Sequence, residues 1–173
     1  MEYSYYFQKE RQPMKKKYIL DEIDLQILSI LMKDGKVTYA EIGKELFISG
    51  GTVHVRIKKM MAAEVILNTE LKVDYTKLGY DITAFLGIYL EKSKMYDNVS
   101  KELLKIPEVL EAHYTTGTYS IFAKIISKDT QHLRSTISDK VQQIQGIQRT
   151  ETFISLDNAF DRPLTYFSSE SND

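Results

Sequence analysis

The stretch SGGTVHVRIKKM, residues 49–60, gathers positive side chains in a chain whose overall charge is nearly balanced. It contains no acidic residue, whereas the whole chain has a formal net charge of −1. On a helical wheel of about 100° per residue, four apolar side chains of residues 52–61 fall within one sector, which is the usual width of a stripe that packs on a core. These expected core residues are Val53, Ile57, Met60 and Met61. The stretch therefore predicts an amphipathic helix whose other face is basic.

That basic face has the composition that contact with DNA requires. Lysine and arginine meet phosphates or guanine acceptors, and a valine such as Val55 contacts a thymine methyl group in the major groove. Glycines at the helix start let backbone N–H groups approach a phosphate closely. Taken alone, the pattern also fits an ordinary solvated helix face. We expect these residues to contact DNA: Ser49, Gly51, Thr52, His54, Val55, Arg56, Lys58 and Lys59.

Two shorter helices precede this one. Asp21 is the N-cap candidate of the first, whose apolar residues recur at helical spacing until the stop signal Asp34-Gly35. Thr38 and Glu41 form a capping box for the second helix. These start and stop signals predict two helices that lead into the basic one.

The third helix is expected to begin after its cap, Ser49, and to run to about residue 63. Residues 65–73 are rich in β-branched side chains and predict two short strands or a wing. Three helices and a wing are typical of a winged helix-turn-helix domain, here over residues 19–73.

The rest of the chain has a different pattern, in which strand and helix signals alternate. The expected strands are 82–90, 109–115, 119–126 and 147–156, and the expected helices are 96–105 and 130–142. This βαββαβ order is the ferredoxin-like (ACT-like) plan, so the fold class is α+β. The remaining segments are a flexible, partly basic arm (1–18), a linker (74–81) and a tail (158–173), which leaves 82–157 as the second domain.

Composition excludes several classes of function. The chain has 173 residues and no cysteine, so it builds no disulfide framework and no thiolate metal site. Neither a secretion signal nor a membrane-spanning run is recognisable, so we expect a cytoplasmic protein without a membrane partner. Its three histidines lack ligand spacing, and no nucleophile with a base or phosphate loop occurs. We expect no metal, no cofactor and no enzymatic activity.

Several stretches resemble the Lrp/AsnC family of bacterial regulators, which respond to leucine, asparagine and other amino acids. The resemblance rests on LDEIDLQILSILMKDGKVTYAEIGKELFIS, TVHVRIKKM, KLGYDITAFLGIYL, EAHYTTGTYSIFAKI and IQRTETFISL, and covers about residues 19–157. It implies a winged helix-turn-helix joined to an effector-binding domain, assembling as dimers and commonly as octamers. Two positions depart from the family pattern: Gly50-Gly51 stands where Pro-Gly or similar is usual, and Glu64 stands where a glycine usually ends the helix.

The sequence HYTTGTYS, residues 113–120, is the candidate effector loop. Gly117 is expected to supply a positive φ and to leave backbone N–H groups open to a carboxylate, although a plain hairpin turn has the same sequence signature. The family resemblance places an amino acid beside this loop, at the junction between dimers. Matched to the asparagine-responsive members, the effector residues are Tyr114, Thr116, Gly117, Tyr119, Ser120 and Gln142. Asparagine is therefore the expected effector.

The expected strand 82–90 is apolar on both of its faces. Such a strand needs cover on both sides, so we expect at least a homodimer that packs sheet against sheet and assembles further. The favoured function is a sequence-specific transcriptional regulator that binds double-stranded DNA under control of an amino acid. The alternative is a global architectural DNA-binding protein with broad amino-acid sensing and little operator specificity.

Overall fold

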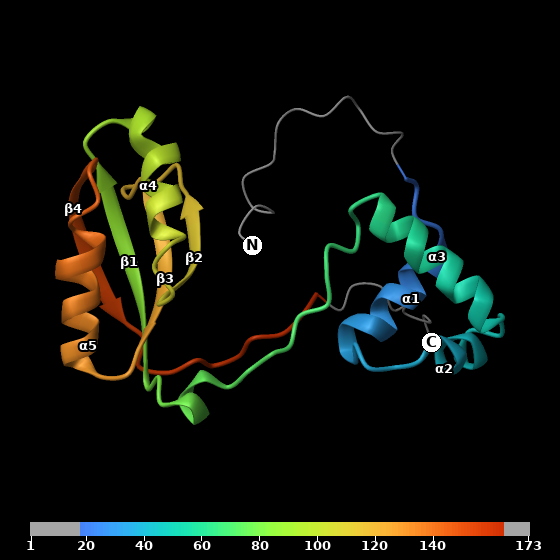
Figure 1. The fold of residues 1–173 in the computed structure, drawn as a ribbon. Helices are drawn as coiled ribbons and strands as arrows, with labels where there is room; N and C mark the ends of the chain where they lie inside the picture. The colour runs from blue at the N-terminus through green and yellow to red at the C-terminus, as the bar shows by residue number, and fades with distance from the viewer. Residues whose placement is uncertain (1–17, 165–173) are drawn as a thin grey trace, which may run out of the picture. The chain divides into compact units, whose positions relative to one another are not determined.

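The computed structural model describes residues 18–164, which divide into two compact units (Figure 1). The first contains the residues up to Leu71 together with the segment that begins at Asp161, and the second is Lys72–Phe160. The expected arm before Tyr18 and the end of the expected tail lie outside the described residues.

The first unit is built from three helices: α1 (Glu22–Lys33), α2 (Tyr39–Glu45) and α3 (Gly50–Ala62). The predicted caps are confirmed, since the side chains of Asp21, Thr38 and Ser49 accept hydrogen bonds from the first turns of the helices they precede. The helices enclose a small core made of Ile27, Leu28, Ile42, Val53, Ile57 and Met60. The core stripe of α3 is therefore confirmed, except that Met61 lies at the edge of its sector and is 45% exposed.

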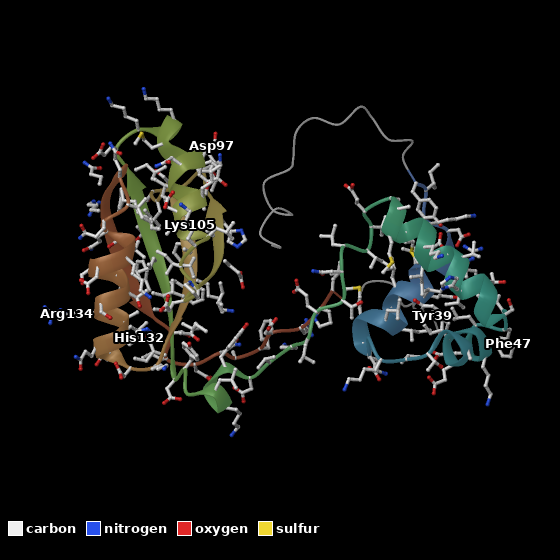
Figure 2. All side chains as sticks on the ribbon, viewed as in Figure 1. Tyr39, Phe47, Asp97, Lys105, His132 and Arg134 are labelled. Atoms are coloured by element: carbon white, nitrogen blue, oxygen red, sulfur yellow. The ribbon has the colours of Figure 1, made fainter. Side chains whose placement is uncertain are left out.

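The turn between α2 and α3 brings two segments of backbone very close together. A Cβ atom added at Gly43 would lie 2.7 Å from the carbonyl oxygen of Ile48, so a side chain at this position would force the turn open. Phe47, within the turn, has a positive φ of 56° and a side chain that is 96% exposed (Figure 2). A bulky residue rarely adopts this conformation, so the turn carries local strain.

The segment after α3 was expected to form two short strands or a wing, and of these alternatives the strands are absent. Residues 65–73 form no strand, because Asn68 donates a local hydrogen bond to Glu70 and Leu67 and Leu71 are exposed instead of forming one buried face. The helix ends at Ala62, and Glu64, just beyond the C-cap residue Ala63, adopts a φ of 59°. The backbone therefore takes the left-handed conformation even though the glycine usual in the family is absent.

The second unit is a four-stranded antiparallel sheet in the order β2-β3-β1-β4. The strands are β1 (Ile82–Leu90), β2 (Val109–Tyr114), β3 (Ile121–Ser127) and β4 (Ile147–Ile154), and the helices are α4 (Tyr96–Leu103) and α5 (Thr130–Ser135). Short helical turns complete the unit: η2 (Tyr75–Leu78), η3 (Ser93–Met95) and η4 (Thr136–Val141). The two α-helices of this unit, α4 and α5, lie on the same face of the sheet (Figure 1), as the βαββαβ plan predicts.

Several boundaries differ from those expected: β2, β4 and α4 each end one or two residues earlier, and two further differences have a structural reason. The expected single helix over 130–142 is α-helical only to Ser135 and continues as the π-helical turn η4, where the N–H of Gln142 bonds to the carbonyl of Ile137 at 2.8 Å. β3 begins at Ile121 because Ser120 closes the preceding loop with its backbone.

The core of this unit lies between the sheet and the helices. Alternate residues of β1, namely Ala84, Leu86, Ile88 and Leu90, are buried against Val99, Leu103, Leu133 and Val141. Among residues 18–164, no helix has the length and apolar character needed to cross a lipid bilayer.

Candidate functional site

The outer face of α3 presents the residues that were expected to contact DNA. All of them are exposed except Arg56, which is partly buried, and Val55 is 51% exposed among cations. The ring of His54 lies against Tyr39 at the start of α2, with 5.4 Å between the ring centroids. Within the described part of the chain, no group of three acidic or histidine side chains is arranged to hold a metal ion.

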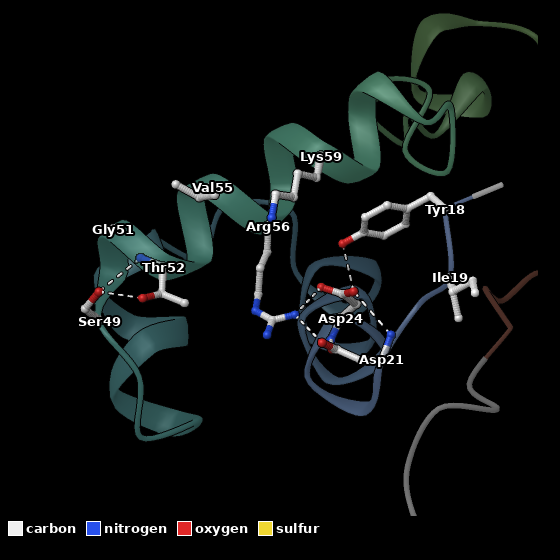
Figure 3. A pocket seen from close by; sticks show the side chains of 10 residues that line it. All are labelled: Tyr18, Ile19, Asp21, Asp24, Ser49, Gly51, Thr52, Val55, Arg56 and Lys59. Atoms are coloured by element: carbon white, nitrogen blue, oxygen red, sulfur yellow. Dashed lines mark hydrogen bonds and ion pairs between the residues drawn. The ribbon is translucent and has the colours of Figure 1, made fainter. Parts of the chain in front are cut away.

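A hollow opens between α3 and the segment that leads into α1 (Figure 3). It is lined by Tyr18, Ile19, Asp21, Asp24, Ser49, Gly51, Thr52, Val55, Arg56 and Lys59. One wall is thus made of expected DNA-contacting residues of α3, and the other contains two carboxylates at the start of α1. The hollow combines cationic and anionic groups.

Arg56 bridges these two walls. Its Nη1 atom lies 2.6 Å from Oδ2 of Asp21 and 2.8 Å from Oδ1 of Asp24. The hydroxyl of Tyr18 donates to Oδ2 of Asp24 at 2.9 Å. The hydrogen bond from Arg56 lowers the pKa of the Asp21 carboxyl below its ordinary value, and burial, then the bond to Asp24, raise the pKa of the Tyr18 hydroxyl. Arg56 therefore reaches toward α1.

Tyr18 and Asp24 were not expected to belong to the site. Asp24 is 1% exposed and is spaced with Ile27, Leu28 and Leu31 on one side of α1, so an acidic residue on an apolar helix stripe was the available signal. A carboxylate in such a position needs a partner, and the spacing alone does not show that the partner comes from α3.

The expected effector loop joins β2 to β3 and closes on itself through its backbone. The N–H of Thr115 bonds to the carbonyl of Ser120 at 3.0 Å, and the Thr115 hydroxyl donates to the carbonyl of Tyr119. Thr116 and Gly117 are exposed at the tip. The expected positive φ at Gly117 is wrong, because the described glycines with positive φ are Gly79 and Gly146. The loop closes through its ends, so its tip needs no left-handed residue.

The other expected effector residues make separate contacts. Tyr114 packs against Tyr96 of α4, with ring centroids 4.4 Å apart. Gln142 donates from Nε2 to the hydroxyl of Thr150 at 2.9 Å. Thr150 pairs with the buried Ile88, so Gln142 lies on the helix-covered side of the sheet.

Tyr119 lies on the opposite side of the sheet. Its hydroxyl donates to Glu151 at 2.9 Å, and Tyr89 and Arg149 bind the other oxygen of the same carboxylate at 3.0 and 2.8 Å. The hydrogen bonds from Tyr119 and Tyr89 lower the pKa of Glu151. Within one chain, the structure therefore does not bring Tyr119 and Gln142 together.

This second face of the sheet, which we call the open face, carries a cluster of aromatic rings: Phe85, Tyr89, Tyr119, Phe122 and Phe153. Phe85 and Phe122 stack with 5.7 Å between centroids, and Phe153 is 45% exposed. The ring of Tyr119 crosses Gly87, where an added Cβ atom would lie 2.4 Å from it. Glycine at this position is therefore what admits the ring.

Comparison with protein families divides the chain in the same way. A family described as the Lrp/AsnC ligand binding domain matches residues 83–165, and one described as winged helix-turn-helix DNA-binding matches residues 20–66.

Whole-chain relatives extend this similarity. The regulatory protein AsnC of Haemophilus influenzae is 45% identical over 139 residues, which are 80% of this chain and 93% of that protein. Its counterpart in Escherichia coli K12 is 40% identical over 147 residues, which are 85% of this chain and 97% of that protein.

Solved structures have the same fold. The structure of E. coli AsnC superposes with a TM-score of 0.80 at 39% identity and covers 86% of this chain and 99% of that chain. A Neisseria meningitidis transcriptional regulator, solved as a complex with L-Met, has a TM-score of 0.79 at 19% identity and covers 83% and 94%.

Proposed function

The chain belongs to the Lrp/AsnC family of transcriptional regulators, and on that premise we propose that asparagine is the amino acid that sets its affinity for DNA. The chain is a regulator with a DNA-binding helix-turn-helix unit and an amino-acid-binding unit, and its relatives are regulators and not enzymes. The effector, the contact residues and the assembly are the parts that we propose.

The observation that carries the choice of asparagine is the side-chain amide of Gln142. Its Nε2 group donates to Thr150, and its Oε1 atom accepts no hydrogen bond from any of residues 18–164. The side-chain amide of asparagine offers an N–H donor to this oxygen, whereas the side-chain carboxylate of aspartate at neutral pH offers only acceptors. Gln142 is exposed in the single chain, and once a ligand covers its side chain an amide oxygen left without a partner costs about 1–3 kcal/mol, so asparagine is favoured over aspartate.

The tip of the effector loop supplies the second part of the proposed site. A Cβ atom added at Gly117 would have no heavy atom within 4 Å, so the backbone on either side of it is open to a ligand. Exposed backbone N–H groups at such a turn bind carboxylates. Because Tyr119 and Gln142 lie on different faces of one sheet, the proposed site is completed by a second chain that brings another copy of these residues to the loop.

Isothermal titration calorimetry tests the effector. We expect heat with asparagine and none with aspartate at the same concentration, and a loss of about 1–3 kcal/mol in binding on Gln142→Ala. Gln143→Ala is the matched control, because Gln143 is also exposed but bonds to the carbonyl of Ser138. Absence of heat with asparagine, or heat with another amino acid such as methionine, contradicts this assignment and leaves the regulator function intact.

We propose further that the exposed face of α3 enters the major groove. Lys59 and Val55 are among the residues that line the hollow. Lys59→Ala is expected to lower the slope of log affinity against log salt concentration by about one. Lys33→Ala, at the exposed end of α1, removes the same charge and is expected to leave the salt dependence unchanged. Equal slopes for the two variants and the unmodified protein contradict the placement of α3 in the groove.

The assembly that we propose is a homodimer formed by two open faces. Its aromatic cluster is of the kind that packed interfaces enrich, and a second sheet covers such a face at a distance of about 10 Å. Light scattering distinguishes a dimer from an octamer, and a monomer contradicts the proposal. A dimer pairs two α3 helices, as half-sites on DNA require. Because it acts on DNA, we place the protein in the cytoplasm.

A further inference from the structure

Arg56 is one of the residues of α3 that are expected to contact DNA, yet within residues 18–164 it forms ion pairs with Asp21 and Asp24, at the start of α1. It lies one helical turn from Thr52 and Lys59, which line the hollow on the DNA side. Its guanidinium reaches across the hollow to Asp21 and Asp24, as Figure 3 shows. The side chain therefore connects the helix that meets DNA with the helix behind it.

The two carboxylates differ in what they require from Arg56. The side chain of Asp21 is 53% exposed, so water solvates it whether or not Arg56 is present. The side chain of Asp24 is 1% exposed and holds its charge inside the helical unit. A buried carboxylate that loses its positive partner is strongly destabilising, so Arg56 does not leave Asp24 for a phosphate without disturbing the fold.

Asp24 is itself held in place from two directions. The Tyr18 hydroxyl donates to its Oδ2 atom at 2.9 Å, and the backbone N–H of Asp21 donates to the same atom at 3.3 Å. Its other oxygen, Oδ1, is left to accept from Arg56 at 2.8 Å. The direction of the Arg56 side chain is thus set by α1 and by the residue just before it.

A link of this kind restricts how α3 turns about its own axis. The apolar contacts of Val53, Ile57 and Met60 fix the depth of the helix, but hydrophobic burial is non-directional and does not by itself select one rotation. A charge-assisted bond between specific atoms does select one, because its energy falls steeply with angle. Any rotation of α3 moves Thr52 and Lys59 with respect to the groove.

We propose that Asp24 and Tyr18 are positioning residues for DNA recognition: through Arg56 they hold α3 at one rotation on α1, so that its exposed residues meet the bases in a fixed register. This inference rests on the proposed contact between α3 and DNA. Arg56 then contributes to specificity through α3, and its bond to Asp24 persists in the DNA complex.

The direction in which one substitution changes the affinity for DNA separates this role from a purely electrostatic one. Asp24→Asn removes a negative charge close to the DNA, and electrostatics alone therefore predicts tighter binding to any sequence. Loss of positioning predicts weaker binding to the preferred sequence, because a helix with a loosened rotation presents its side chains less accurately. The two explanations give opposite changes in affinity.

The experiment uses the full chain and a duplex that the unmodified protein selects from a random pool, with a scrambled duplex as the comparison. For Asp24→Asn we expect affinity for the selected duplex to fall about tenfold, roughly the effect of one mismatched base pair, and affinity for the scrambled duplex not to fall. Arg56→Gln is expected to lose the same preference, and the double variant to lose no more than either single variant. Glu45→Gln, at the exposed end of α2, is the matched control that removes one negative charge without touching the link.

The outcomes separate the possibilities. If Asp24→Asn binds the selected duplex as well as or better than the unmodified protein, the proposal is overturned. It is also overturned if Arg56→Gln lowers the salt slope by about one while Asp24→Asn has no effect, since Arg56 is then a direct phosphate contact. If the unmodified protein selects no duplex, the contact between α3 and DNA itself fails.

Tyr18→Phe keeps the test decisive if Asp24→Asn does not fold. It removes one hydrogen bond to Asp24 and leaves the ion pair in place, so the helical circular dichroism is expected to be retained. We expect about a threefold loss of preference between the two duplexes, in keeping with the loss of one hydrogen bond. An unchanged preference for a folded Tyr18→Phe protein overturns the proposal.

Discussion

The helical unit and the sheet unit differ in the kind of surface that each leaves exposed in a single chain. In the helical unit, three helices enclose six buried apolar residues, and the exposed face of α3 is polar apart from Val55 and Met61. In the sheet unit, twelve residues are buried on one face, while the open face displays stacked rings. The comparison indicates that the exposed face of the first unit suits a charged ligand, whereas the open face of the second unit suits an apolar partner surface.

The sharpest test within the helical unit compares the two faces of α3. Ile57→Ala opens a cavity among buried residues and is expected to lower the free energy of unfolding by about 2–5 kcal/mol. Val55→Ala, on the exposed face, is expected to change it by less than about 0.5 kcal/mol while weakening DNA binding. Urea denaturation of the full chain, followed by circular dichroism, measures the free energy of unfolding of both variants. Equal losses from the two substitutions would show that the inner and outer faces of α3 are wrongly assigned.

A charge placed on the open face tests whether the sheet unit associates through its aromatic cluster. Phe122→Asp places a carboxylate against Phe85 and is expected to weaken self-association by about 2–4 kcal/mol, enough to give monomers at micromolar concentration. Asn98→Asp, on the exposed side of α4, adds the same charge away from the rings. Sedimentation velocity is expected to show a smaller particle for the first variant alone. An unchanged mass for Phe122→Asp would mean that chains associate through another surface.

The strained turn between α2 and α3 gives a smaller effect of opposite sign. Phe47→Gly relieves the cost of a positive φ and loses almost no buried area, so we expect a gain of about 0.5–1 kcal/mol in stability. Phe47→Ala retains a Cβ atom and is expected to gain nothing. Thermal denaturation of the pair distinguishes backbone strain from loss of the ring, and equal midpoints would argue against strain at this residue.

The smallest expected effect is a pH dependence at the start of α1. Arg56 lowers the pKa of Asp21 in the folded chain below the ordinary value of 3.8. A carboxyl of this kind stabilises the fold above its unfolded pKa, and the contribution is lost as the pH falls through the lower folded value. Between pH 5 and pH 2, the free energy of unfolding should therefore fall less steeply for Asp21→Asn than for the unmodified protein. The difference should be under about 1 kcal/mol in total, because the pair is partly exposed. Identical slopes would show that Asp21 gains nothing from Arg56.

Much of this architecture follows from local patterns in the sequence. The caps at Asp21, Thr38 and Ser49, the buried stripe of α3 and the alternation along β1 are each set by neighbouring residues, and the structure confirms them. The strand order required the further rule that βαββαβ chains place both helices on one face.

Other features depended on distance in space. The partner of Arg56 is 32 residues away at Asp24, and a long side chain on a helix flank has several directions open to it. Gly117 was expected to turn the chain through a positive φ, but hydrogen bonds at the ends of the loop close it instead. The expected strands at 65–73 lack both a ladder and a common buried face. The proposed effector residues remain a prediction. Their spacing in the sequence does not show that they lie on different faces of the sheet.

The contact between Gly87 and Tyr119 has a consequence for the history of this sheet. A methyl group at position 87 would occupy the space of the Tyr119 ring, since its Cβ atom would lie 2.4 Å from that ring. An alanine there would displace the ring and release its hydroxyl from Glu151, so Gly87 and Tyr119 constrain each other's substitutions. We expect descendants of this chain to change the two positions together, and ancestors to have acquired the glycine before or with the ring. We therefore expect a relative with a side chain at this position to pack its open face by a different arrangement of rings.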